Sequence, residues 1–181
     1  MEKAIKRLLL TLALVIPMIN CGCVARYSYW LPMAENGKLV NSHGVGSIAP
    51  ADTIEFFFDN IRLRVSSVVT GDGIQVGLSL LVPKGRSASF LSDETVLRGD
   101  QSLKTTSKLD VTCWDSETLR RVHIRPTDNL TDNLFAGIVM FGNLQREQYW
   151  ITLPAITIDG NIHNIPEIEF IKKKGVGFFG P

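Results

Sequence analysis

The sequence has few of the residues from which enzyme and metal sites are built. Its 181 residues include three cysteines and three histidines, and three cysteines are too few for a fold held together by disulfides. His43, His123 and His163 are far apart, so no two of them form a local metal-binding pair. The motifs of serine hydrolases, zinc peptidases, phosphate loops and dinucleotide-binding proteins are also missing. We therefore expect a protein that is not an enzyme and that binds no cofactor or metal.

An excess of charge of one sign is also missing. The chain has 19 lysines and arginines against 18 aspartates and glutamates, a formal net charge of +1. Nucleic-acid-binding proteins normally carry a basic excess or a basic stripe, so we expect no nucleic-acid partner. The chain is 45% hydrophobic, which is enough for a core, and its length fits one domain with an appendage.

The N-terminus combines basic residues with a short apolar run. Lys3, Lys6 and Arg7 precede the uncharged apolar residues 8–19. A helix of this length reaches about 18 Å, which is short of a hydrocarbon core of about 30 Å. The pattern therefore favours a secretory signal peptide over a membrane-spanning helix.

Two cysteines follow this run, and Cys23 has the small residue Gly22 directly before it. The segment resembles the signal peptides of bacterial lipoproteins, in which such a cysteine is acylated and becomes the new N-terminus. We expect acylation of Cys23, with Cys21 after Asn20 as the alternative. The resemblance implies three acyl chains, hence stable attachment to a membrane of the bacterial cell envelope. Because Val24 rather than aspartate follows Cys23, it implies the outer membrane rather than the inner membrane in a bacterium that has both.

Apolar and polar residues alternate through most of the chain after residue 52, as in half-buried strands. Residues 61–65 and 74–82 both alternate, and residues 70–73 between them read Thr-Gly-Asp-Gly. Glycine and aspartate tolerate positive φ, so this segment predicts a hairpin turn. Many short strands with turns between them predict an antiparallel β-sandwich, immunoglobulin-like in topology, with a partly open β-barrel as the alternative. Further strand-like runs are 87–91, 96–98, 108–114, 119–125, 134–141, 148–153, 155–158 and 162–171.

Two segments depart from simple alternation. Residues 134–141 are apolar on both faces, which predicts a central strand that is covered on both sides. Phe56, Phe57 and Phe58 are out of phase with Ile61, which predicts a bulge or kink near residues 59–60.

Composition divides the chain into four parts. Residues 24–52 are rich in glycine, proline, asparagine and serine, although Leu39 and Val40 could form an edge strand. The expected parts are a signal peptide (1–22), a tether with a possible edge strand (23–52), the β-sandwich domain (53–174) and a Gly/Phe-rich tail (175–181).

Two groups of residues are candidate contact sites. On a strand, Arg121, His123 and Arg125 share one face, where they could bind a carboxylate or phosphate. The alternative is a solvated row that pairs with acidic neighbours on adjacent strands. Phe178 and Phe179 could add to the sheet edge of a partner, or could pack back on their own sandwich.

Three further features have structural explanations beside functional ones. Cys113 alternates with polar residues and is expected to point inward as a small apolar side chain. The segment 127–133 could offer oxygen ligands to Ca²⁺, but aspartate and asparagine also belong in turns, which we favour. Tyr27, Tyr29 and Trp30 are expected to pack in a first strand, with contact to a membrane interface or a sugar as alternatives.

Together these patterns predict a non-enzymatic, membrane-anchored lipoprotein. Its β-sandwich would be an interaction or structural module that contacts another, unidentified envelope protein. A small-ligand or glycan-binding module is the alternative, and an envelope hydrolase is the third hypothesis.

Overall fold

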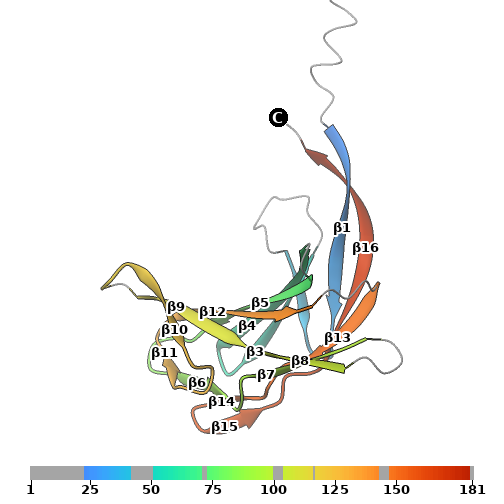
Figure 1. The fold of residues 1–181 in the computed structure, drawn as a ribbon. Coiled ribbons are helices and arrows are strands. Elements are labelled where there is room, and N and C mark those ends of the chain that lie inside the picture. The colour runs from blue at the N-terminus through green and yellow to red at the C-terminus, as the bar shows by residue number, and fades with distance from the viewer. Residues whose placement is uncertain are drawn as a thin grey trace, which may run out of the picture. The chain divides into compact units, whose positions relative to one another are not determined.

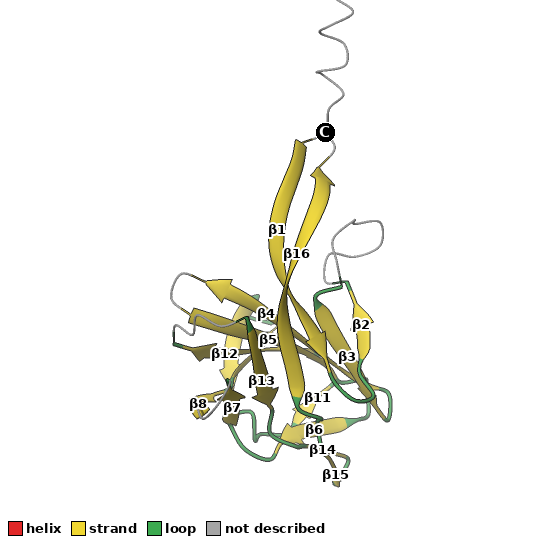
Figure 2. Cartoon of the chain, turned by 90° about the vertical axis from the view of Figure 1, so that its right-hand side faces the viewer, coloured by secondary structure: helices red, strands yellow, loops and turns green. Residues whose placement is uncertain are grey.

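The structure, a computed structural model, consists of strands and turns over the part of the chain that it describes (Figures 1 and 2). That part contains no helix with the length and apolar character that a membrane crossing requires. Side chains are not described for residues 23–27, 69–70 and 176–179. The described residues are 23–41, 51–70, 73–99, 104–115, 117–142 and 147–179.

The chain divides into two compact units, one of which contains residues 29–173 and nearly all of the strands. The other combines residues 1–28 with 174–181. Its described residues are the beginning of one strand and the end of another, and these two strands are hydrogen-bonded neighbours in one sheet.

The strands form three sheets (Figure 1). The five-stranded sheet has the order β1 (Cys23–Met33), β16 (Ile168–Phe179), β13 (Gln148–Thr152), β7 (Glu94–Arg98) and β8 (Lys104–Lys108). The seven-stranded sheet has the order β10 (Arg120–Ile124), β9 (Asp110–Asp115), β12 (Leu134–Phe141), β5 (Gly73–Leu81), β4 (Ile61–Thr70), β3 (Thr53–Phe58) and β2 (Lys38–Val40). The four-stranded sheet has the order β11 (Leu130–Thr131), β6 (Ser87–Phe90), β14 (Ile156–Ile158) and β15 (Asn161–His163).

The predicted antiparallel β-sandwich class is confirmed. Every strand pair with a recorded register is antiparallel, and each sheet is open, with an end strand on either side. Figures 1 and 2 agree that β6, β11, β14 and β15 lie together at one end of the unit, beneath the two larger sheets.

Two hairpins follow from local sequence. Strands β4 and β5 form the predicted hairpin and pair from Arg62 opposite Leu81 to Thr70 opposite Gly73. The predicted bulge near residues 59–60 is wrong: Phe58 pairs with Ile61, and the two residues between them have φ values of 46° and 72°. Two consecutive positive φ angles make a tight hairpin turn whose twist matches that of its strands.

The prediction that residues 134–141 are covered on both sides is also wrong in part. The segment forms β12, which is central, because it pairs with β9 on one side and β5 on the other. Its inward side chains, such as Phe135 and Val139, are buried, whereas Leu134, Ile138 and Met140 are exposed. No second layer covers these side chains among the described residues, because the other sheets pack on the inward face.

Tyr149 connects the two large sheets inside the core. It is fully buried on β13, and its ring lies 4.7 Å from the Trp30 ring and 5.3 Å from the Phe170 ring, measured between centroids. Its hydroxyl hydrogen-bonds with the Ser67 hydroxyl on β4, which in turn donates to the Gln75 carbonyl at 3.3 Å. This polar contact between the two large sheets is buried, and both hydroxyls are satisfied by it.

The expected tether contributes to both large sheets. Residues 38–40 form the edge strand that Leu39 and Val40 suggested, at one end of the seven-stranded sheet. The segment from Cys23 to Met33 is β1, and Trp30 on this strand is buried beside Tyr149. Burial of a large aromatic side chain is strongly favourable, which explains why this segment is held in a sheet.

Candidate functional site

The seven-stranded sheet turns one face away from the core, and we call it the open face. Antiparallel partners point to the same side, so the printed registers identify its residues. Leu134 pairs with Leu81, and Arg121 pairs with Trp114. Trp114 follows the inward-facing Cys113, and therefore projects on the open face beside Leu134.

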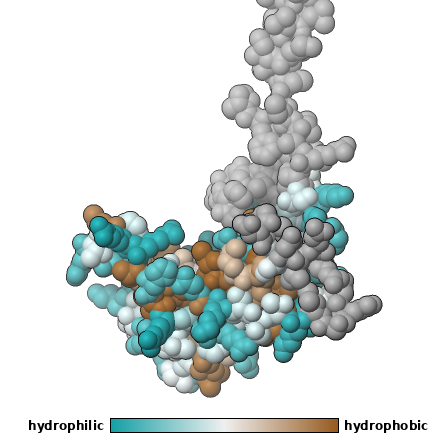
Figure 3. Space-filling model, viewed as in Figure 1, coloured by the Kyte–Doolittle hydropathy of each residue, from teal (hydrophilic) through white to brown (hydrophobic). Residues whose placement is uncertain are grey.

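Large apolar side chains gather on this open face. Trp114 is 53% exposed, Leu134 52%, Met140 45% and Ile138 41%. We call these four side chains, with the half-buried Leu81, the apolar patch. Figure 3 shows apolar residues at the surface in the middle of the unit, with hydrophilic residues beside and below them. A sheet face that meets only water usually carries polar side chains, so this patch requires an explanation.

Charged side chains border the patch. The predicted row is only partly assembled: Arg121 and His123 lie on β10, whereas Arg125 follows the end of that strand, and all three are exposed. His123 Nδ1 lies 2.9 Å from Asp110 Oδ1. His123 thus pairs with an acidic residue on the adjacent strand β9. This is what the alternative interpretation, a solvated row of charged side chains, predicts.

Sequence reasoning missed a buried carboxylate at the other end of the open face. Glu55 on β3 is only 5% exposed, and its Oε2 lies 2.6 Å from Arg64 Nε and 3.7 Å from Arg62 Nε. The two guanidinium groups satisfy a charge that would be costly to bury alone. A hollow of about 240 Å³ lies beside Arg64, lined by Val40, Asn41, Thr53, Arg64, Ser66, Gly77, Leu78 and Ser79.

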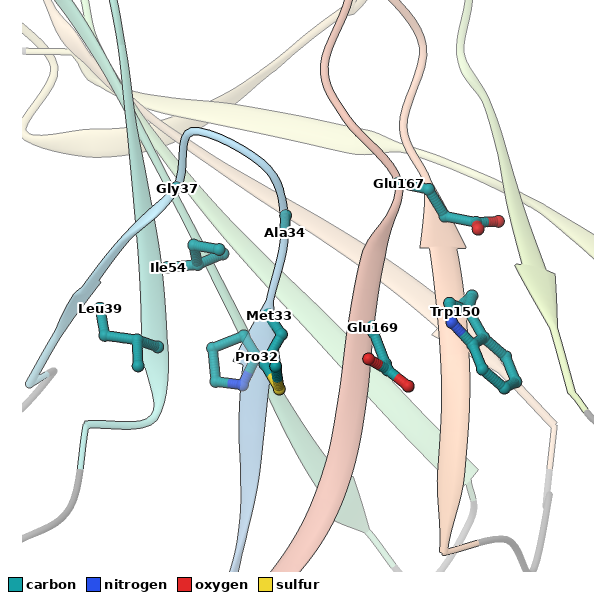
Figure 4. Close-up of a pocket in the computed structure, with 9 residues that line it drawn as sticks. All are labelled: Pro32, Met33, Ala34, Gly37, Leu39, Ile54, Trp150, Glu167 and Glu169. Atoms are coloured by element: carbon teal, nitrogen blue, oxygen red, sulfur yellow. The ribbon is translucent and has the colours of Figure 1, made fainter.

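A larger groove of about 520 Å³ crosses the outer side of the five-stranded sheet and reaches β2 and β3. This volume is within the range of small-molecule and peptide sites. Figure 4 shows Glu169 on β16 between Trp150 on β13 and Met33 on β1, with Leu39 beyond β1. We call it the Trp150 groove, lined by Pro32, Met33, Ala34, Gly37, Leu39, Ile54, Trp150, Glu167 and Glu169.

One wall of this groove already holds a cation. The Arg98 guanidinium carbon lies 4.5 Å from the centre of the Trp150 ring, and Arg98 Nη2 donates to Glu167 Oε2 at 2.8 Å. The hydrogen bond to Glu167 raises the pKa of Arg98. The Thr152 hydroxyl donates to the other Glu167 oxygen at 3.3 Å. Glu169 accepts a hydrogen bond from Gln148 Nε2 at its Oε1.

The chemistry of the remaining candidates is limited. Cys113 is partly buried on β9, as predicted, and burial together with the nearby Asp115 charge raises its thiol pKa. A raised pKa keeps the thiol protonated and unreactive near neutral pH. His163 Nε2 lies 3.7 Å from Asp59 Oδ2. Within the described ranges, no three histidine, cysteine, aspartate or glutamate side chains are grouped so as to hold a metal.

The segment 127–133 consists of a turn on each side of the two-residue strand β11. The Asp128 amide donates to the Arg125 carbonyl at 2.9 Å, and Asp132 Oδ1 accepts from the Gly85 amide at 2.7 Å. Asp132 has a φ of 51°, which aspartate tolerates in turns. These contacts agree with the turn that we favoured for this segment.

Some predicted residues lie outside the described part. Cys21 is not described, and Cys23, Phe178 and Phe179 are described only through their backbones in β1 and β16. The side chain of Tyr27 also lies outside it. Acylation and tail docking therefore stay predictions.

No family model, curated protein or solved structure matches this chain.

Proposed function

We propose that this protein is a lipid-anchored, non-enzymatic component of the bacterial cell envelope, whose β-sandwich binds another envelope protein through the open face. The observation that carries the proposal is the apolar patch, the group of apolar side chains that β9, β12 and β5 bring together on the open face. The anchor is supported by the resemblance of residues 1–23 to a lipoprotein signal, with Cys23 as the acylated residue. The residue after it, Val24, supports the outer membrane.

The contrast between β4 and β12, which lie on either side of β5, supports a docking role for the patch. On β4 the open face carries Arg62, Arg64 and Ser66, followed by one exposed apolar side chain, Val68. On β12 the same face carries Leu134, Ile138 and Met140. Burying such side chains contributes about 25 cal/mol for each Å² removed from water, so a partner that covers them gains affinity.

Site-specific photo-crosslinking in intact cells tests this proposal. A photoreactive amino acid is placed at Ile138 in the patch, and in a control at Ile162, which is 64% exposed on β15. We expect a discrete protein adduct from position 138 and none from position 162. The adduct should disappear when Met140→Asp is added, because Met140 is two residues from Ile138 on the same face and a carboxylate there opposes burial. No adduct at position 138, or equal adducts at both positions, would overturn the proposal.

A ligand-binding module is the second candidate function, and the Trp150 groove favours it. The groove combines an aromatic ring, apolar side chains and two carboxylates. A few polar groups within an apolar lining are typical of ligand sites. Because this groove and the apolar patch share no residue, the two functions can be tested separately.

A further inference from the structure

We propose that the Trp150 groove binds an extended peptide segment in which a basic side chain and an apolar side chain stand two residues apart. The inference rests on the second candidate function, ligand binding, and names its ligand class. It does not depend on the apolar patch.

The charge of the groove selects the basic side chain. Glu167 and Glu169 flank the fully buried Ile168, so both carboxylates project to the outer side of the sheet. Gln148 occupies Glu169 Oε1, and no partner is recorded for Glu169 Oε2 among the described side chains. An ammonium or guanidinium group can bind this second oxygen with a charge-assisted hydrogen bond.

Arg98 shows that this environment suits a cation. Its guanidinium stacks on the Trp150 ring and pairs with the Glu167 carboxylate. An incoming basic group would meet the same combination, the Trp150 ring and the Glu169 carboxylate. Trp150 pairs with both Arg98 on β7 and Glu169 on β16. The indole is therefore flanked by a filled cation position on one side and an open carboxylate on the other.

The opposite wall selects the apolar side chain. Met33 is 46% exposed and Leu39 is 45% exposed, with Pro32 between the two in Figure 4. These side chains gain free energy when an aliphatic group covers them. A purely charged ligand would leave this wall uncovered.

The strand spacing sets the distance between the two side chains. Strands β13, β16 and β1 are successive neighbours, and neighbouring strands are about 4.8 Å apart, so Glu169 to the far side of β1 is one to two spacings, about 5–10 Å. An extended peptide rises about 3.3 Å per residue and points alternate side chains the same way, which puts residues i and i+2 about 6.6 Å apart. The pattern basic–any–apolar therefore fits the groove.

Binding of a short peptide to the full-length protein, followed by ¹⁵N NMR, tests the inference. The probe is Ser-Gly-Lys-Ser-Leu-Gly-Ser, and the control peptide has Glu in place of Lys. The indole N–H signals of the three tryptophans are assigned by single Trp→Phe variants. We expect saturable shifts of the Trp150 signal with the Lys peptide and none with the Glu peptide. The Trp114 signal, on the other sheet, should not move.

Two variants separate site binding from general attraction. Glu169→Gln removes the carboxylate charge and should weaken binding of the Lys peptide at least threefold. Glu117→Gln removes an exposed charge from the turn between β9 and β10, and should leave binding unchanged. Equal binding of both peptides, no saturable shift of Trp150, or equal losses from both variants would overturn the inference. None of these results would affect the crosslinking test of the apolar patch.

Discussion

The hydrogen bond between Tyr149 and Ser67 makes a quantitative prediction about the contact between the two large sheets. Tyr149→Phe removes one hydroxyl but leaves the ring between Trp30 and Phe170. The Ser67 hydroxyl keeps the Gln75 carbonyl as an acceptor, so no buried donor loses its last partner. The cost should therefore be that of one buried hydrogen bond, about 1 kcal/mol of unfolding free energy.

Ser67→Ala should be more costly. It leaves the hydroxyl of Tyr149, which is 0% exposed, with no recorded partner. An unsatisfied buried hydroxyl costs about 1–3 kcal/mol. The double variant removes both hydroxyls, and no polar group is then left unsatisfied. It should be no less stable than Ser67→Ala alone, so the two losses are strongly non-additive.

Urea denaturation followed by tryptophan fluorescence measures these differences, with midpoints compared at equal slopes. In a domain of this size, about 1 kcal/mol corresponds to a decrease of about 2–4 °C in Tm. Ser66→Ala is the matched control, because Ser66 is the next residue on β4 and points to the open face. Its effect should stay within about 0.5 kcal/mol. Additive losses from Ser67→Ala and Tyr149→Phe would refute the reasoning, because independent hydroxyls do not couple.

Three further predictions concern single groups. Burial raises the pKa of Tyr149, so the phenol loses its proton at lower pH in the unfolded chain than in the folded protein. The unfolding free energy should therefore fall above pH 10 by about 1.4 kcal/mol per pH unit. Tyr149→Phe should abolish this part of the alkaline loss, as measured by urea titrations at several pH values. Glu55→Gln should lower the unfolding free energy by about 1–2 kcal/mol, because the amide keeps the size but loses the charge paired with Arg64, and an unchanged urea midpoint would contradict this. Gly73→Ala should cost about 3 kcal/mol or prevent folding, because its Cβ would lie 2.0 Å from a β12 carbonyl oxygen. Gly85→Ala, also at positive φ but with nothing within 4 Å of its Cβ, should cost only about 1–2 kcal/mol by thermal melting.

The strands could be predicted where local pattern decides them. The β4–β5 hairpin follows from alternation on both sides of residues 70–73, because side chains that alternate can bury one face of a sheet. The hairpin turn at residues 59–60 was harder to predict, because two consecutive non-glycine residues rarely both adopt positive φ. The phase break after Phe58 was visible, but a bulge and a tight hairpin both produce one.

The apolar patch could not be separated from the core by sequence alone. The residues of β12 are apolar on both faces. The same pattern is expected if another layer of the protein covers the outer face and if a binding partner covers it. Which layer covers a strand depends on strand order, and the register of β12 with β9 and β5 is a long-range property. Trp114 follows Cys113, which was expected to point inward, so alternation puts Trp114 on the outward face; its place beside Leu134 depends on the long-range pairing of β9 with β12.

The Trp150 groove was beyond sequence reasoning for a different reason. Its lining comes from five residues between Pro32 and Leu39, and from Ile54, Trp150, Glu167 and Glu169, which are distant in the sequence. The local pattern of β16 places Glu167 and Glu169 on one face, but nothing local brings Met33 and Leu39 beside them. Only the pairing of β1 with β16, at the end of the five-stranded sheet, assembles these segments.

The most direct test of the proposed lipoprotein is the mass of its N-terminal peptide, measured on protein purified from the membranes of the native cell. The account predicts a mature chain that begins at Cys23, or at Cys21 as the alternative, with acyl chains on that cysteine. Cys23→Ala should then leave an uncleaved, unacylated precursor, while the same change at Cys113 on β9 should have no effect on processing. A native chain that still carries residues 1–20, or whose N-terminal cysteine is unmodified, would contradict the account.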